Sequence, residues 1–103
     1  MAIPRIALHG MEVEINLDNG IFLASTQIPV KDGGENRVYI NAASHNVATA
    51  LSELSGKIQV ASSVLNFANP YGDTTYQRVH EFCLHVSILA GEIPYEERTQ
   101  SAA

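Results

Sequence analysis

The pattern of apolar and polar residues in the first forty positions is typical of β-strands. From Met11 to Leu17 every second residue is apolar, with acidic or amide side chains in between. A period of two is typical of a half-buried β-strand. Asp18-Asn19-Gly20 follows, and these residue types tolerate the positive φ angles of a tight turn. We therefore predict a β-hairpin whose second strand covers residues 21–28.

Further strands are predicted on both sides of this hairpin. Pro29 cannot donate a backbone hydrogen bond, so it marks the end or an edge of a strand. Residues 31–36 have the composition of a second turn, and residues 37–40 are the return strand. Residues 3–8 form a further candidate strand, with Gly10 as a bulge or bend after it. The pattern indicates an antiparallel β-meander of three to four strands.

The spacing of apolar residues becomes helical between residues 41 and 69. Apolar residues there recur at alternating spacings of four and three, at Val47, Leu51, Leu54, Ile58, Ala61 and Leu65. Because the phase continues across Gly56, we predict one long helix, capped by Asn41 or Ser44. About 27 residues would span about 40 Å, more than the diameter of about 33 Å expected for the domain, so the helix would overhang its sheet.

A second helix is predicted from Asp73 or Thr74 onward. Thr74-x-x-Gln77 has the form of a capping box, and Gly91 is placed to end the helix just before Pro94. The expected fold is α+β: the meander followed by a two-helix hairpin with a long first helix, packed as two layers. Residues 1–94 are expected to form this single domain, and residues 95–103 a polar, frayed C-terminal tail.

Composition and charge narrow the classes of function. The chain has 103 residues, of which 46% are hydrophobic, and 11 acidic against 6 basic side chains, so the sequence favours one folded domain and disfavours nucleic-acid binding. Glu12 and Glu14 share one strand face, with Asp18 near its end, which we interpret as a solvated face that discourages edge pairing. The single Cys and the lack of a leader-like N-terminus favour a cytoplasmic protein without a membrane span.

Residues that could carry chemistry are scattered. His80 and His85 are five residues apart, about 140° around a helix, and so do not form a ligand pair. Cys83 lies mid-helix on an apolar side, as expected of a buried structural thiol. The sequence contains no nucleophile elbow and no glycine-rich phosphate loop. We therefore expect no catalytic residues, no metal and no cofactor, and predict that the protein is not an enzyme.

One face of the predicted long helix is small and neutral where an exposed face is normally charged. The residues on it that we predict to form an interface are Ser52, Gly56, Gln59 and Ser63. The only charges on the helix are Glu53 and Lys57. We expect the stripe to be covered by a protein partner or by a second copy of the chain, in a homodimer or higher oligomer.

Two functions from different classes follow from these observations. The first is a small non-enzymatic interaction protein, acting by protein–protein binding as an adaptor, inhibitor or assembly component, and as a homo-oligomer. The alternative is a small-molecule binding protein, for an anionic metabolite or nucleotide, with a pocket between subunits or between sheet and helices. The polar contacts in that case would be Arg37, Tyr39, Tyr76, Arg78 and His80.

Overall fold

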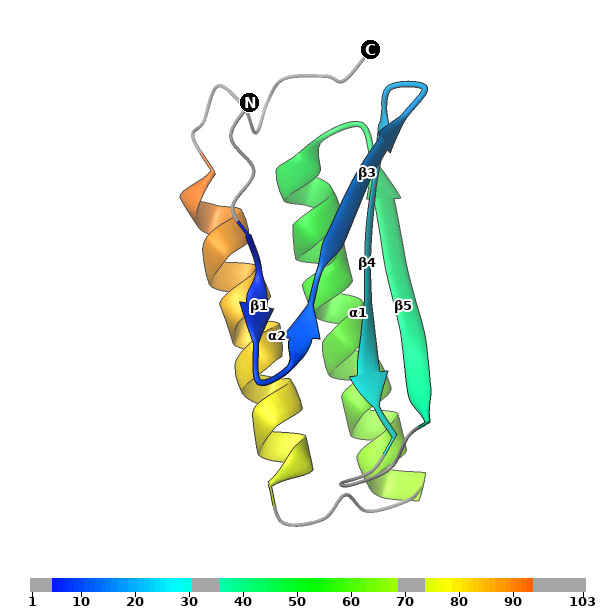
Figure 1. Ribbon diagram of the computed structural model, residues 1–103, viewed down its shortest axis with the longest axis vertical. Helices are drawn as coiled ribbons and strands as arrows, with labels where there is room; N and C mark the ends of the chain where they lie inside the picture. Colours follow the sequence, from blue (N-terminus) through cyan, green and yellow to red (C-terminus); the bar gives the residue numbers. More distant parts are fainter. Residues whose placement is uncertain (1–4, 31–35, 69–73, 94–103) are drawn as a thin grey trace.

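The chain folds as two layers, a sheet of antiparallel strands and a helical hairpin that covers one face of it (Figure 1). The structure, a computed structural model, describes residues 5–30, 36–68 and 74–93. Its elements are β1 (Ala7–Leu8), β2 (Met11–Glu12), β3 (Glu14–Asp18), β4 (Ile21–Pro29), β5 (Arg37–Ser44), α1 (Val47–Ala68) and α2 (Thr75–Glu92). The predicted α+β order, meander first and a long first helix, is confirmed.

The main sheet has the order β3-β4-β5, and β1 and β2 form a separate two-stranded hairpin. Asn19 and Gly20 join β3 to β4 with φ angles of 51° and 78°, so the predicted tight turn is confirmed. β4 ends at Pro29, as expected. The predicted single strand over residues 11–17 is interrupted at Val13, whose N–H instead donates to the carbonyl of Ile6.

The N-terminal strand is shorter than predicted, and the second turn is only partly described. Of residues 3–8, only Ala7 and Leu8 are strand, and residues 1–4 lie outside the described ranges. Gly10, with a φ of 81°, makes the predicted bend between β1 and β2. Most of the second predicted turn, residues 31–35, is not described, but β4 and β5 on its two sides pair antiparallel.

The long helix begins later than predicted because β5 extends further than the sequence indicated. β5 pairs with β4 as far as Ser44, which lies opposite Phe22. The helix cap is therefore Asn46, whose Oδ1 accepts a hydrogen bond from the N–H of Thr49; the caps predicted at Asn41 and Ser44 are wrong. α1 runs without a break through Gly56, but its 22 residues span only about 33 Å. The predicted length of about 40 Å, on which the overhang depended, is wrong.

The second helix begins where the sequence predicts, but its cap and its C-terminal end differ from the prediction. Thr74 is the N-cap residue, but its side chain makes no capping hydrogen bond, so the capping box does not form. Gly91 lies inside α2, which continues to Glu92 and has Ile93 as its C-cap. Ile93 is buried, and the added turn of helix carries this side chain into the core. Pro94 and the predicted tail, residues 95–103, lie outside the described residues.

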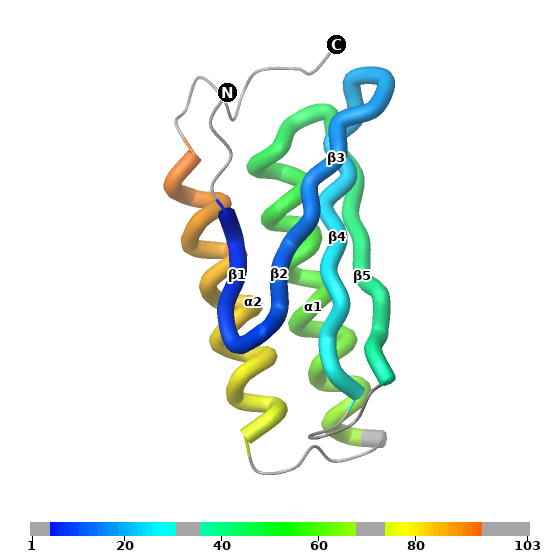
Figure 2. The backbone as a smooth tube through the Cα atoms, viewed as in Figure 1, coloured from blue at the N-terminus to red at the C-terminus, as the bar shows by residue number. Residues whose placement is uncertain are grey.

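The core lies between the sheet and the two helices (Figure 2). Met11 and Val13 are buried in it as predicted, and Ile15 is half-buried. Leu17 remains 58% exposed, because the end of the β3–β4 hairpin extends past the first turn of α1 (Figure 1). Within the described ranges, neither helix is long and apolar enough to cross a membrane.

A reciprocal pair of hydrogen bonds joins the two helices. The Ser55 hydroxyl donates to the backbone carbonyl of Cys83 at 3.1 Å, and the Cys83 thiol donates to the carbonyl of Ser55 at 3.1 Å. Both side chains are buried, so Cys83 occupies the interior position that the sequence predicted. These two hydrogen bonds connect the buried side of α1 to α2 within the chain.

Candidate binding groove beside strand β5

Strand β5 forms an open edge of the sheet, since in the described part of the chain it pairs only with β4. Lys57 of α1 donates a hydrogen bond of 2.9 Å from its Nζ to the carbonyl of Asn41, so this carbonyl points away from β4. In an extended strand, backbone groups point alternately to one side and to the other. The residues that present N–H and C=O groups at the open edge are therefore Arg37, Tyr39, Asn41 and Ala43.

An open groove of about 790 Å³ lies between this edge and α1; we call it the β5–α1 groove. Its lining is mainly apolar, and it consists of Val38, Tyr39, Ile40, Asn41, Glu53, Gly56, Lys57, Val60 and Ala61. Val60 is 65% exposed, and Val64, one turn further along α1, is 60% exposed. Exposed aliphatic side chains beside unpaired strand backbone are the features of a surface that binds an extended segment.

No contact within the protomer explains why residue 56, which lines the groove, is a glycine. A Cβ atom added at this glycine would meet no other atom within 4 Å. A glycine inside a helix costs about 1 kcal/mol relative to alanine. Packing inside the protomer does not require a glycine at this position. Any advantage of glycine over alanine must therefore come from a contact with another molecule.

The structure divides the predicted interface stripe. Ser52, Gly56, Gln59 and Ser63 are all exposed, but only Gly56 lies in the β5–α1 groove. Ser52 instead lines a depression between the helices, which it shares with Ser87 and Gly91 of α2. The groove is therefore displaced around α1 from the centre of the stripe, toward β5.

Two exposed valines of α1 were not among the residues predicted for the interface. Val60 lines the groove, and Val64 lies one turn further along the helix. The available signal was their phase: the two valines follow Gly56 at intervals of four residues, outside the series that contains Leu54 and Ile58. An added apolar stripe beside the core stripe indicates a second covered face.

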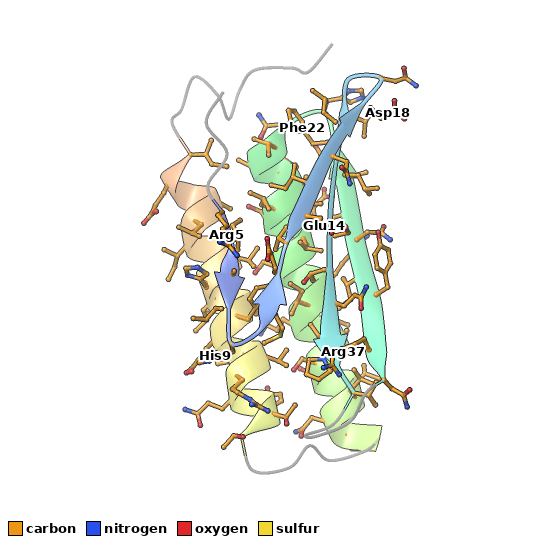
Figure 3. The ribbon with its side chains drawn as sticks, viewed as in Figure 1. Arg5, His9, Glu14, Asp18, Phe22 and Arg37 are labelled. Carbon is orange, nitrogen blue, oxygen red and sulfur yellow. The ribbon has the colours of Figure 1, made fainter. Side chains whose placement is uncertain are left out.

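The five residues predicted for small-molecule binding form two separate groups. Arg37 and Tyr39 line a polar pocket of about 300 Å³ on the outer face of the sheet, together with Glu12 and Glu14; Figure 3 shows Glu14 and Arg37 on their strands. The others lie on α2, which packs against α1, β1 and β4 rather than joining this pocket.

The group on α2 is held by contacts within its own helix. Tyr76 stacks on His80 with ring centroids 6.2 Å apart, and Arg78 donates to the hydroxyl of Thr75 at 3.3 Å. These side chains lie on α2 and do not reach Arg37 or Tyr39 on β5. The structure thus provides no single site that combines the five residues.

Two further side-chain contacts involve acidic residues. His9 and Glu81 are 3.1 Å apart, which ties the β1–β2 hairpin to α2, and Arg5 lies 3.6 Å from Glu12. Among the residues that the structure describes, no three His, Cys, Asp or Glu side chains are grouped so that they could hold a metal ion.

Comparison of the chain with protein-family models, curated proteins and solved structures gives no match. The β5–α1 groove and the polar pocket are the two surfaces of the described residues whose geometry bears on function.

Proposed function

We propose that this chain is a small interaction protein, acting by protein–protein binding rather than by catalysis, and that it binds through the β5–α1 groove. The observation that carries the proposal is the combination of an unpaired strand edge with exposed aliphatic side chains, Val60 and Val64, on the adjoining helix. An added segment would pair with backbone groups at the open edge of β5 and cover the valines at the same time.

The proposal predicts that a charge at Val60 abolishes binding, whereas the same change elsewhere does not. The matched control is Ile88, an aliphatic residue of α2 that is 59% exposed against 65% for Val60 and does not line the groove. The wild-type chain, Val60→Glu and Ile88→Glu would each be used as bait in cells that express the chain naturally. Captured proteins would be quantified by mass spectrometry. They would include the chain itself, as a copy that can be distinguished from the bait.

We expect at least one protein to be retained by the wild type and by Ile88→Glu but lost from Val60→Glu. Circular dichroism must show that all three baits have the same helical content. The same set of proteins on all three baits would contradict the proposal, because binding would then not involve the groove.

A second candidate function, the binding of a small polar ligand, is favoured by the polar pocket. Two of the predicted contacts, Arg37 and Tyr39, line it. Its two carboxylates, Glu12 and Glu14, outnumber the single guanidinium, so a zwitterionic ligand suits the pocket better than the nucleotide or anionic metabolite considered from the sequence.

This second function is tested by thermal unfolding in the presence of zwitterionic metabolites. A ligand at 100 times its Kd raises stability by about 2.7 kcal/mol, and Arg37→Met would remove the increase if the ligand occupies this pocket. An unchanged melting temperature across such compounds would count against it and would leave the groove proposal untouched.

A further inference from the structure

We propose that the β5–α1 groove is filled by the β5 strand of a second copy, paired antiparallel across a two-fold axis, so that two three-stranded sheets join into one of six strands. This inference rests on the proposed function, because it names the occupant of the same groove. Three properties of the described residues favour a second copy over an unrelated partner.

The first property is the side-chain pattern of β5. A strand added beside β5 must present apolar side chains toward α1 and polar side chains toward the outer face of the sheet. β5 has this pattern itself. Val38, Ile40 and Ala42 face the helices, whereas Arg37, Tyr39 and Asn41 are exposed on the other face. The edge residues have odd numbers, so an antiparallel two-fold pairing brings edge residues opposite edge residues.

The second property is the spacing that such a sheet would impose on the helices. α1 packs against both β5 and β4, so two copies of α1 would lie roughly two strand spacings apart, about 9.6 Å. Packed helices have axes separated by about 8–10 Å, and small residues at the contact allow the shorter distances. Gly56 lies in the groove and leaves space there. The absence of a side chain at this position would let the two α1 helices approach closely.

The third property is charge complementarity. Glu53 and Lys57, the two charged residues of α1, both line the groove and are four residues apart. Across a two-fold axis the two helices run antiparallel, and an axis midway between positions 53 and 57 places the acidic position of one copy opposite the basic position of the other. Two such pairs form in the dimer, and an unrelated partner would have to reproduce this order by chance.

Lys57 would then protect the open edge of β5 until a second copy replaces its hydrogen bond. In the single chain its ammonium group donates to the carbonyl of Asn41 and so blocks one edge acceptor against indiscriminate pairing. When a second β5 strand docks, a backbone N–H of that strand replaces the ammonium, and Lys57 is released toward Glu53 of the second copy.

The test uses two substitutions at one edge residue whose N–H is not needed inside the protomer. Tyr39→Ala and Tyr39→Pro both remove the phenol ring, but only proline removes the N–H group at the open edge. Molecular mass would be measured by light scattering over a range of protein concentrations, with circular dichroism as the check of folding.

We expect the wild type and Tyr39→Ala to dimerise with affinities within about tenfold of each other, and Tyr39→Pro to remain monomeric with its helical signal retained. Equal masses for the alanine and proline variants would overturn strand pairing. A wild type that stays monomeric at every concentration would overturn the second copy as occupant. The proposed function would survive that result if proteins other than the chain itself were still lost from the Val60→Glu bait.

Amide hydrogen exchange of the wild type tests the same inference without any variant. The N–H groups of Tyr39 and Asn41 should exchange rapidly in dilute solution and at least about tenfold more slowly at concentrations where the mass doubles. Exchange at these two residues that does not change with concentration would contradict the pairing, even if a dimer forms.

Discussion

The two edges of the β3–β4–β5 sheet differ in length, charge and cover. β3 has five residues, with the acidic residues Glu14 and Asp18 at its two ends, and Val13 separates it from the preceding β1–β2 hairpin. β5 has eight residues, no acidic residue, and an apolar groove beside it. Short length and charged side chains are the usual means of preventing edge pairing. The β3 edge is therefore permanently protected, whereas the β5 edge is guarded by one movable side chain, that of Lys57.

The largest expected effect is a difference between proline substitutions at two kinds of position in β5: residues whose backbone N–H bonds to β4, and residues whose N–H lies at the open edge. Ile40 lies opposite Thr26 of β4, and its N–H points toward β4. Ile40→Pro should therefore destabilise the protomer by about 1–3 kcal/mol more than Ile40→Ala, because a buried ladder bond is lost. At Tyr39 the proline and alanine variants should differ by less than about 1 kcal/mol. Urea unfolding at dilutions where the chain is monomeric measures both differences, and equal differences would refute the assignment of edge groups.

Substitutions at Gly56 should have opposite effects on the stability of the protomer and on the affinity between copies. Gly56→Ala should stabilise the protomer by up to about 1 kcal/mol, because nothing lies within 4 Å of the added Cβ. Gly56→Leu should weaken association by about 1–3 kcal/mol, since its side chain must fit between closely packed helices. Thermal melting and light scattering give the two quantities. A leucine variant with a higher melting temperature and unchanged mass would show that this face of α1 is never covered.

Charge reversal tests whether Glu53 and Lys57 face each other across two copies. Glu53→Lys and Lys57→Glu should each weaken association by roughly 1 kcal/mol, since each single change places like charges together. The double variant restores opposite charges in the reversed order. We expect it to recover most of the lost affinity in sedimentation equilibrium measurements. Additive losses in the double variant would argue against the two-fold arrangement.

The smallest effect is expected at the protected edge. Glu14→Thr replaces an exposed acid of β3 by a residue that is favourable in strands. It should change the free energy of unfolding by no more than about 0.5 kcal/mol and leave the affinity between copies unaltered. Stronger dimerisation in this variant would mean that β3, not β5, is the edge in use, because the substitution removes a charge that opposes pairing there.

The elements that could be predicted from the sequence are those set by local pattern. The turn at Asn19 and Gly20, the continuous helix through Gly56 and the order of strands before helices all follow from residue periodicity and turn chemistry. The start of α1 could not be predicted in this way. Asn41 and Ser44 are good capping residues by type, but pairing of β5 with β4 holds both in a strand.

The candidate site was predicted only in part, because it depends on two segments that meet in space. The predicted stripe of small residues includes Gly56, which lines the β5–α1 groove, whereas the other three predicted residues lie outside the groove. Nothing local in the sequence reveals which side of a helix will lie beside an open strand edge. The same limit applies to Arg37 and Tyr39, which share a pocket, and to Tyr76 and His80, which lie on another element.

Pairing of one β5 strand with another can be observed directly by isotope-filtered nuclear Overhauser measurements. The sample would mix labelled and unlabelled chains in equal amounts at a concentration where light scattering shows two copies. We expect contacts between copies that join backbone protons of Tyr39 and Asn41 to β5 of the second chain, and methyl groups of Val60 to α1 or β5 of that chain. Contacts between copies confined to α2 or to β3, with none at β5, would contradict it.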